Sequence, residues 1–314
     1  MPPRLAKLLA LVVAVALVAG AFWYRGRGDG GGGSGDGDGG RNGTVRVACI
    51  SELADVCRTT FDGDGFEVTV ADAAETATAL QESTGEPPFD AWVTLDPWPA
   101  MVDVGRSTEQ QPPLFEDRSV RVASSPLATL AQPGLRDDAG AWERLASRAA
   151  NGANVGVPAH DTALGAVVEG QAAVGLVGSP DFGNEVFPEV VPVLKTVLAS
   201  APRLSSAELL RQMVVQQGSY DTVTGPSFLV ERTARTSEAQ RRQLVSVATA
   251  PVVRAVVVVA TVAGTDQADR VTELLTGETG VKALKESGWT VPADKGPTGL
   301  PAPDVLVALR EEIE

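Results

Sequence analysis

The stretch TVRVACISELADVC, residues 44–57, changes from a strand-like to a helix-like pattern within a few positions. Its apolar, β-branched run 45–49 predicts a strand, and 52–61 predicts the helix that follows. The alternation continues with strands predicted at 66–70 and 91–95 and a helix between them at 73–82. Strands and helices in this order predict an α/β fold with parallel pairing and right-handed crossovers.

A second alternation follows between residues 119 and 231. SVRVASSPLATLA (119–131) predicts a strand broken at its Ser-Ser-Pro, AWERLASRAA (141–150) a helix, and NVGVPAHDTALGAVVEG (154–170) a strand, a loop and a helix. Ser205 and Glu208 form a capping box, which predicts the start of a helix that runs to Gln217. SYDTVTGPSFLVE (219–231) predicts a short strand running into a loop.

The last part of this pattern is the most β-branched segment of the chain, RRQLVSVATAPVVRAVVVVATVA (241–263). Such runs are typical of buried central strands. DQADRVTELLTGETGVKALKESGW (266–289) then predicts two helices, with Gly277 and Gly280 between them.

Composition excludes several classes of protein. The 314 residues carry a formal net charge of −14, and no cluster of Lys and Arg offers a surface for nucleic-acid phosphates. One histidine, His160, and two cysteines exclude a His-rich metal site and a four-ligand zinc site. Because no nucleophile elbow lies near His160, we expect it to be a loop residue. His, Cys and Lys are scarce near the predicted strand ends, so we expect the protein to be no enzyme, with no cofactor.

The N-terminal segment predicts attachment to a membrane. An apolar run from Leu8 to Tyr24 lies between basic residues, and Trp23 and Tyr24 are typical of a retained interfacial anchor. We therefore expect residues 1–25 to form a signal-anchor or transmembrane helix; Ala19-Gly20-Ala21 leaves a cleaved signal peptide as the alternative. Residues 26–43, rich in Gly and Asp, predict a flexible tether. This places the body on the extracytoplasmic side of the cell membrane, as a single-pass protein.

Taken in order, the segments resemble an extracytoplasmic solute-binding protein of the type II periplasmic-binding class. This is an ABC-transporter substrate-binding family that includes molybdate- and sulfate-type proteins. The resemblance covers most of residues 44–291 and depends most on RVTELLTGETGVKALKESGW (270–289), which is similar to the family's closing helix pair and its terminal Gly-aromatic dipeptide. YDTVTGPSFLVE (220–231) is similar to the segment that re-enters the first lobe, and VPAHDTALG (157–165) to a helix start in the second.

The resemblance implies two α/β lobes with a hinge and a central cleft. Lobe 1 would comprise residues 44–122 and 245–291, and lobe 2 residues 123–244. The tail 292–314, with a short acidic helix, would be an appendage on lobe 1.

Polar residues that follow predicted strands or start predicted helices are the first candidates for ligand contacts. Ligands of open α/β sheets lie beyond the carboxyl ends of strands, where helix N-termini present free N–H groups. Ser51 and Glu52 follow the first strand, and Asp161 and Thr162 start a helix of lobe 2. Each pair is either a ligand contact or a plain helix cap.

Two further groups lie at the third strand and the first crossover. Thr94, Asp96 and Trp98 are candidates to hold a cation or a sugar face, with packing of Trp98 between the lobes as the alternative. Ser124 and Ser125 fall where the family places hydroxyls against bound oxyanions; they are otherwise turn residues before a proline.

Tyr220 and Asp221 lie near the return crossover, where Asp221 suits an amine better than an anion. No arginine falls at any of these strand ends, although anionic organic ligands usually recruit a guanidinium. The sequence therefore leaves the ligand class open.

The two cysteines, Cys49 and Cys57, lie at a strand end and two helical turns into the next helix. Export would place them in an oxidising compartment, where we expect a disulfide; free buried thiols are the alternative, and catalysis or metal binding is disfavoured. Such a bridge would stabilise the fold by about 2–3 kcal/mol and fix the turn that carries Ser51.

The sequence thus predicts a membrane-anchored solute-binding protein that captures a small ligand between two lobes for the permease of an ABC-type importer. A ligand-free sensor or adaptor protein of the cell envelope, built on the same fold, is the alternative.

Overall fold

In a computed structural model, residues 43–63, 65–115, 119–198, 203–263 and 269–313 are described. The predicted signal-anchor and nearly all of the predicted tether, residues 1–42, lie outside these ranges. Among the helices of the described ranges, none is long and apolar enough to cross a membrane. Gly43–Glu314 pack as one unit.

The first strands and helices follow the predicted order. β1 (Val45–Ile50) pairs in parallel with β2 (Phe66–Ala71) on one side and with β3 (Ala91–Asp96) on the other. The connecting helices are η1 (Ser51–Leu53) with α2 (Ala54–Thr60), then α3 (Ala73–Gln81), and α4 (Trp98–Thr108) follows β3. The predicted parallel pairing is therefore confirmed, and each crossover carries its helix to a face of the sheet.

The β-branched segment supplies the centre of the sheet. β8 (Arg254–Thr261) lies between β3 and the long strand β4 (Ser119–Ala131) and is antiparallel to both. The described strands form one eight-stranded sheet in the order β2-β1-β3-β8-β4-β6-β5, with β7 beside β4. Its remaining strands are β5 (Val155–Gly156), β6 (Thr222–Pro226) and β7 (Val245–Ala248).

The strand β4 corrects one prediction, because it runs through the Ser-Ser-Pro without a break. Up to Pro126 it pairs with β8, and from Leu127 onward it pairs with β6. A proline has no N–H to donate, and here it lies where the strand changes partners. β4 therefore joins the two halves of the sheet.

The second half contains another correction. After β6 the chain does not enter a loop but begins α9 (Ser227–Ala234) directly after Pro226. The other helices of this half lie before and after β6 in the chain: η2 (Pro133–Leu135), α5 (Trp142–Ala150), α6 (Ala163–Val177), η3 (Asn184–Val186), α7 (Phe187–Leu198), α8 (Ser206–Val215) and α10 (Ser237–Arg241).

The predicted pair of helices near the C-terminus is α11 (Asp269–Thr276) and α12 (Glu278–Ser287). Gly280 lies inside α12 rather than between the two helices.

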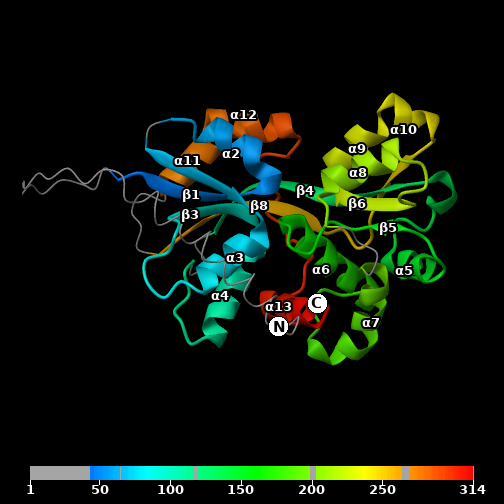
Figure 1. The fold of residues 1–314 in the computed structure, drawn as a ribbon, viewed down its shortest axis with the longest axis horizontal. Coiled ribbons are helices and arrows are strands. Elements are labelled where there is room, and N and C mark those ends of the chain that lie inside the picture. The colour runs from blue at the N-terminus through cyan, green and yellow to red at the C-terminus, as the bar shows by residue number, and fades with distance from the viewer. Residues whose placement is uncertain (1–42, 64, 116–118, 199–202, 264–268, 314) are drawn as a thin grey trace, which may run out of the picture. The chain divides into compact units, whose positions relative to one another are not determined.

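Helices cover both faces of each half of the sheet. Figure 1 shows α2, α11 and α12 above the half built on β1 to β3, with α3 and α4 beneath it. In the other half, α8, α9 and α10 lie above, and α5, α6 and α7 below. One large cluster of buried hydrophobic side chains contains residues of both halves, and a smaller one lies around α8 and β6.

The last helix, α13 (Pro303–Ile313), lies between the two halves. It contacts α4 on one side and α6 and α7 on the other, beneath the sheet in Figure 1. The predicted lobe boundaries stay a prediction, and the predicted C-terminal helix contacts elements that belong to both predicted lobes.

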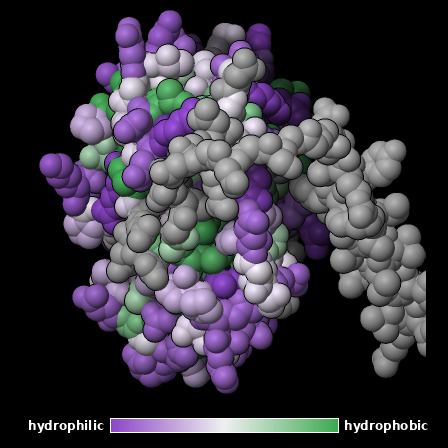
Figure 2. All heavy atoms as spheres, turned by 90° about the vertical axis from the view of Figure 1, so that its left-hand side faces the viewer, coloured by the Kyte–Doolittle hydropathy of each residue, from purple (hydrophilic) through white to green (hydrophobic). Residues whose placement is uncertain are grey.

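Exposed hydrophobic side chains are few and dispersed. On the face shown in Figure 2, hydrophilic side chains predominate and hydrophobic ones form small groups. Among the described residues, the large hydrophobic side chains that are exposed are Val120, Val215, Val252 and Leu274, from four different segments. Side chains of this kind that are scattered singly do not define an interface.

Candidate functional site

A cavity of about 830 Å³ lies between the two halves of the described chain. This is the size of a small-molecule pocket. One wall comes from the start of η1 and α2, the start of α3 and the end of α12; the other comes from the loop before α6 and the starts of α8 and α9. Its polar and charged lining is Ser51, Glu52, Asp55, Asp72, Asp161, Thr162, Arg203, Ser205, Ser206, Glu208, Arg232, Glu286 and Ser287.

The cleft is a meeting point of helix N-termini. η1 begins directly after β1 and α3 directly after β2, so both start at the carboxyl edge of the parallel strands. α6 begins after Thr162 and α8 after Ser205, from the opposite wall. Each helix start presents N–H groups that need acceptors, and the partners of these groups decide what the cleft has left to offer.

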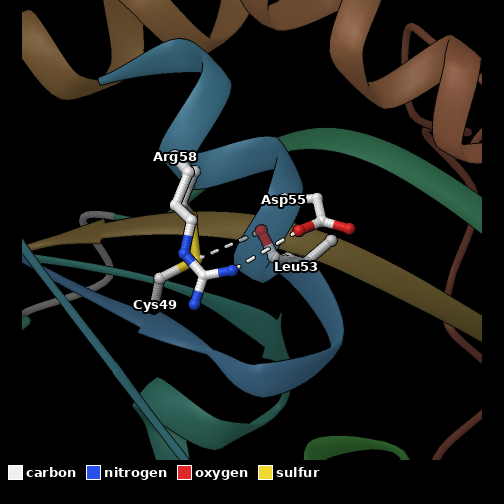
Figure 3. The surroundings of a disulfide bond; sticks show 5 residues. Cys49, Leu53, Asp55 and Arg58 are labelled. Atoms are coloured by element: carbon white, nitrogen blue, oxygen red, sulfur yellow. Dashed lines mark hydrogen bonds and ion pairs between the residues drawn. A yellow bond between two sulfur atoms is a disulfide. The ribbon is translucent and has the colours of Figure 1, made fainter. Parts of the chain in front are cut away.

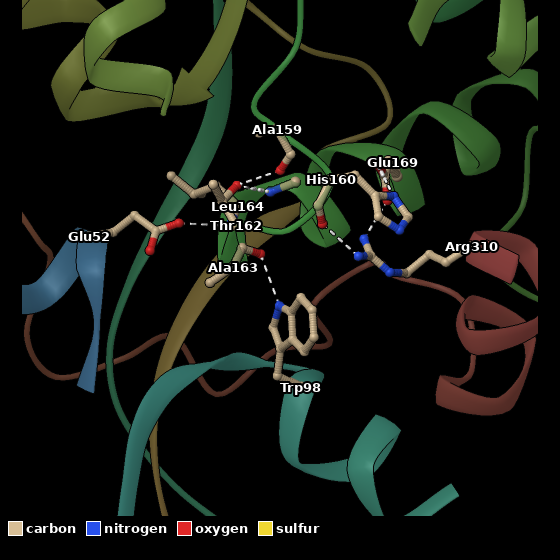
Figure 4. A network of polar contacts seen from close by, with 10 residues as sticks. Glu52, Trp98, Ala159, His160, Thr162, Ala163, Leu164, Glu169 and Arg310 are labelled. Carbon is tan, nitrogen blue, oxygen red and sulfur yellow. Dashed lines mark hydrogen bonds and ion pairs between the residues drawn. The ribbon is translucent and has the colours of Figure 1, made fainter. Parts of the chain in front are cut away.

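The first turn of α6 is bound by side chains from both walls. Glu52 Oε1 accepts a hydrogen bond from the Leu164 N–H at 3.1 Å, while Thr162 Oγ1 accepts one from the Gly165 N–H at 3.0 Å. Figure 4 shows Glu52 reaching toward this turn across the cleft. Thr162 is thus an N-cap, and Glu52 places a carboxylate where the helix dipole favours a negative charge.

The start of α3 is bound in a similar way. The Ala74 N–H donates to the Asp161 carbonyl at 3.1 Å, which joins the two walls through the backbone. Asp72 precedes α3, and its Oδ1 lies 2.8 Å from the hydroxyl of Ser51. Four of the residues predicted from the sequence, Ser51, Glu52, Asp161 and Thr162, therefore line the cavity together with Asp72.

The environment of Glu52 has an electrostatic consequence. Glu52 is partly exposed, but protein atoms around its carboxyl displace water, and this burial raises its pKa above the ordinary glutamate value. Hydrogen bonds from its own N–H, from Leu164 and from Ser51 oppose the rise, and the negative charge of Asp72 adds to it. The side chain therefore lies in a place that is short of positive charge.

The start of α8 confirms the predicted capping box and shows that it faces the cleft. Ser205 Oγ accepts from the Glu208 N–H at 3.3 Å, and Glu208 Oε2 accepts from the Ser205 N–H at 3.0 Å. The hydrogen bonds from Ser205 lower the pKa of Glu208 below its ordinary value. The helix ends at Val215, two residues before the predicted end.

An aromatic pair closes one side of the cavity. The rings of Phe228 and Trp289 lie 5.2 Å apart between centroids, with Trp289 buried and Phe228 partly exposed. Gly288, before the tryptophan, has a φ of 103°, and a Cβ there would lie 2.4 Å from the Phe228 ring. Only glycine fits both the conformation and the contact, which gives the Gly-aromatic dipeptide of the sequence a physical reason.

Other residues predicted from the third strand do not line the cavity. Thr94 is fully buried in β3, and Asp96 forms an ion pair with Arg121 at 2.9 Å. Trp98 is 3% exposed, and its Nε1 donates to the Ala163 carbonyl at 3.2 Å. The structure thus places Trp98 as a packing and hydrogen-bonding residue between the halves.

The predicted crossover residues have structural partners as well. Ser124 Oγ accepts from the Asp294 N–H, and Ser125 Oγ lies within hydrogen-bond distance of the Pro126 carbonyl and Ser227 Oγ. Tyr220 is buried against α8, and this burial raises the pKa of its phenol. The Asp221 carboxylate accepts from the Asn154 N–H at 2.8 Å. The cavity lining contains none of these crossover residues.

The two cysteines are joined in a disulfide that spans the turn carrying Ser51 and Glu52, which we call the cleft turn (Figure 3). Cys49 is the next-to-last residue of β1, Cys57 lies in α2, and their Cα atoms are 6.6 Å apart. Both side chains are fully buried. The bridge closes the loop that carries Ser51 and Glu52, so it ties the direction of the cleft turn to the strand below it.

A second polar cluster lies on the other side of the first turn of α6. The Arg310 guanidinium from α13 forms a buried ion pair with Glu169 and donates to the His160 carbonyl at 2.6 Å. Glu169 Oε1 also lies 2.9 Å from His160 Nδ1, and the guanidinium stands over the Trp98 ring, 5.0 Å from its centroid. Figure 4 shows this cluster opposite Glu52. We call Arg310, Glu169, His160 and Trp98 the rear cluster.

Sequence reasoning missed several cleft residues. Asp72 follows the end of β2 and precedes α3, so the rule that selected Ser51 could have found it. Phe228 lay in a segment predicted to be a loop, and Arg203 and Arg232 carry no local signal. The described residues contain no group of three or more His, Cys, Asp or Glu side chains that could hold a metal ion.

Comparison with known proteins supports the fold. No family model and no curated protein matches the chain. Among solved structures it is similar to the periplasmic binding protein AfuA from Actinobacillus pleuropneumoniae, with fructose-6-phosphate bound (TM-score 0.58, 12% identity, 86% of this chain, 96% of that one). Also similar are the sulfate-binding protein SubI from Mycobacterium tuberculosis H37Rv (0.51, 13%, 79%, 87%) and Trichodesmium IdiA (FutA) with iron and citrate (0.54, 11%, 86%, 97%).

At these identities the likeness concerns the fold. The described chain has the α/β fold of periplasmic solute-binding proteins, with the curled mixed sheet and the helices on both faces of each half. AfuA is a periplasmic binding protein and SubI a sulfate-binding protein. This supports the family that the sequence resembles, without selecting a lineage within it.

Proposed function

We propose that this protein binds a small solute in the cleft between its two halves. The observation that carries the proposal is the cavity of about 830 Å³ at which helices from both halves begin. In open α/β folds, ligands bind at this position, beyond the carboxyl ends of the strands. The likeness to periplasmic binding proteins supports the same conclusion.

Binding fits the cleft better than catalysis does. The cavity lining contains no histidine, cysteine or lysine, and His160 lies in the rear cluster. Thr162 and Ser205 are helix caps, and the hydroxyls of Ser51 and Ser206 donate to groups within the protein. The hydroxyls of Ser51 and Ser205 donate to carboxylates, and the described lining has no histidine, cysteine or lysine that would activate them as nucleophiles.

The cellular setting proposed here is that of an importer. The body is held outside the cytoplasmic membrane by the N-terminal segment, and it delivers its ligand to an ABC-type permease. The apolar run with interfacial aromatics supports the membrane anchor, and the disulfide supports an oxidising compartment. A molybdate- or sulfate-type lineage stays a prediction from the sequence.

A ligand screen tests the binding function. The full-length protein is heated with oxyanions, sugars, amino acids and amines, each in excess, and a rise of several degrees in Tm for one class supports the proposal. Flat curves for all four classes, together with native mass spectra that show no co-purified small molecule, would overturn it.

A sensor or adaptor role is the second candidate, and the contacts across the cleft favour it. Hydrogen bonds within the protein link the two halves through Glu52, Asp161, Trp98 and Arg310. A protein whose halves are held in one arrangement can present one fixed surface to a partner. A flat ligand screen combined with specific capture of an envelope protein by the full-length chain would support this role over the first.

A further inference from the structure

We propose that the cleft selects an organic cation, such as an amine or a quaternary ammonium ion, rather than an anion or a metal ion. This inference rests on the proposed binding function and names the ligand class for the same cleft. It depends on which hydrogen-bonding groups are already used, on where the charges lie, and on the size of the cavity.

Three of the helix starts that line the cavity, those of α3, α6 and α8, are already bound by the protein. The N–H groups of Leu164 and Gly165 in α6 are bound by Glu52 and Thr162, and that of Ala74 in α3 by the Asp161 carbonyl. The start of α8 is bound by its own capping box. An anion would have to displace a carboxylate from a helix N-terminus, which already stabilises that negative charge.

The charges of the lining favour a cation. The cavity is lined by six carboxylates and two guanidinium groups, an acidic excess of three to one, against 40 to 26 in the whole chain. Both guanidinium groups, Arg203 and Arg232, are exposed at the rim. Three of the carboxylates, Glu52, Asp72 and Asp161, are only partly exposed. The deeper part of the cleft therefore has a negative charge without a positive side chain of its own.

The cleft turn shows the effect of this imbalance. Burial and the neighbouring charge of Asp72 raise the pKa of Glu52, although the carboxyl accepts several hydrogen bonds. A cationic group next to Glu52 and Asp72 would remove this cost, since opposite charges stabilise the ionised form. An anion or a neutral sugar would leave the cost in place.

Size and shape favour an organic cation over a metal ion. The described residues provide no group of three or more ligating side chains that could surround one ion, so the carboxylates are spread along the cleft. A cavity of about 830 Å³ holds an extended small molecule. The partly exposed ring of Phe228, backed by Trp289, offers a face on which an ammonium group or an alkyl chain can pack.

Calorimetry with defined probes tests the proposal. The full-length protein is titrated with spermidine, putrescine and choline chlorides, and in parallel with sodium sulfate, sodium citrate, fructose 6-phosphate and glucose, at one fixed ionic strength. We expect saturable binding of at least one of the three cations, with one ligand per chain, and no saturation by the anions or by glucose.

Matched variants connect the binding to the cleft. Glu52→Gln keeps an oxygen that can accept from Leu164 but removes the charge, and we expect it to weaken cation binding tenfold or more. Phe228→Leu keeps the apolar volume and should weaken binding several-fold. Glu109→Gln, an equal loss of charge on an exposed residue at the end of α4, should change the affinity less than twofold.

The outcomes separate this inference from the proposed function. Saturable binding of an anion or glucose, without binding of the cations, would overturn the cation inference and leave the solute-binding function intact. If none of the seven probes binds and the wider ligand screen is also flat, both fail. Cation binding that Glu52→Gln and Glu109→Gln weaken equally would place the cation elsewhere on the acidic surface, which also overturns the inference.

Discussion

The two sides of the first turn of α6 are held by polar contacts of opposite character. On the cleft side, Glu52 reaches Leu164 from a position that is partly exposed and has an excess of negative charge. On the rear side, Arg310 and Glu169 form a pair in which both charges are buried, and the Trp98 ring covers the guanidinium. The first contact is open to a ligand, and the second is part of the core.

The difference suggests that the rear side stabilises the fold and that the cleft side contacts the ligand. A charge pair in a dry surrounding cannot lose one partner without leaving the other buried and unpaired. A partly exposed carboxylate can gain a further partner from water or a ligand, because one side of it stays accessible. We therefore expect the rear cluster to hold the two halves together and the cleft side to adapt to the ligand.

Replacing Arg310 gives the largest expected effect. In Arg310→Met, the Glu169 carboxylate stays buried without its guanidinium partner, and we expect the free energy of unfolding to fall by about 3–5 kcal/mol. Denaturation of the full-length protein in urea, followed by circular dichroism, measures the change.

The double variant Arg310→Met/Glu169→Met is the control for this prediction. Removing both charges in favour of apolar side chains should restore most of the lost stability, because no unpaired charge remains. If the double variant is as unstable as the single one, packing by α13 and not the charge pair supports the rear side, and the comparison fails.

The disulfide should come next in size, since it supports the turn on the cleft side. For Cys49→Ala/Cys57→Ala we expect a loss of about 2–3 kcal/mol, because the unfolded chain regains the freedom of the short closed loop. The same urea titration measures it, and ligand binding by the variant shows whether the turn keeps its direction. A loss below about 1 kcal/mol would mean that the packing of α2 alone fixes the turn.

Trp98 tests the hydrogen bond that joins the halves beside the rear cluster. Trp98→Phe keeps an aromatic ring but loses the bond from Nε1 to the Ala163 carbonyl. Trp142 is an equally buried tryptophan whose Nε1 has no hydrogen-bond partner in the described chain, so Trp142→Phe removes ring area without the loss of a hydrogen bond. We expect Trp98→Phe to cost about 1 kcal/mol more than Trp142→Phe. Equal losses would show that the bond adds nothing to packing.

Much of the fold could be predicted from local patterns. The strand–helix alternation before residue 96 gave the parallel strands, and the β-branched run gave the central strand β8. The break predicted at Pro126 was wrong because the change of strand partner that tolerates a proline depends on β6, far along the chain. The loop predicted after β6 was wrong for a related reason, since α9 is stabilised by its packing on β4, β6 and α8.

The cleft could be predicted only where a local rule applied. Ser51, Glu52, Asp161 and Thr162 were found because they follow strands or start helices. Residues at the other predicted crossovers obey the same rule and are bound within the structure instead. The rear cluster had one local signal, the single charged residue of the mostly apolar helix α6, Glu169, which indicates a buried partner. That partner, Arg310, lies 141 residues away, a distance that no local pattern bridges.

The pH dependence of Glu52 is the smallest expected effect and the most specific test of the cleft side. Its pKa is raised in the folded protein above the ordinary value of 4.5, so the folded state holds the proton more tightly than the unfolded chain. The resulting stabilisation is present below the unfolded pKa and is lost as pH rises through the folded pKa. At a pH above the folded pKa of Glu52, we expect the free energy of unfolding of Glu52→Gln to exceed that of the wild type by about 0.5 kcal/mol. At a pH below the unfolded pKa, we expect the two free energies to be nearly the same.

Urea titrations at several pH values measure this difference, and Glu109→Gln provides the baseline for an exposed carboxylate. A Glu52→Gln variant that loses stability above the folded pKa would mean that the charged contact with the α6 N-terminus outweighs the cost of burial. The contact between Glu52 and Leu164 would then stabilise the fold as the rear cluster does, and a cation would have to compete with the Leu164 N–H for the carboxylate. A gain above the folded pKa instead supports a carboxylate that is held in the cleft at a cost, which a positively charged ligand would offset.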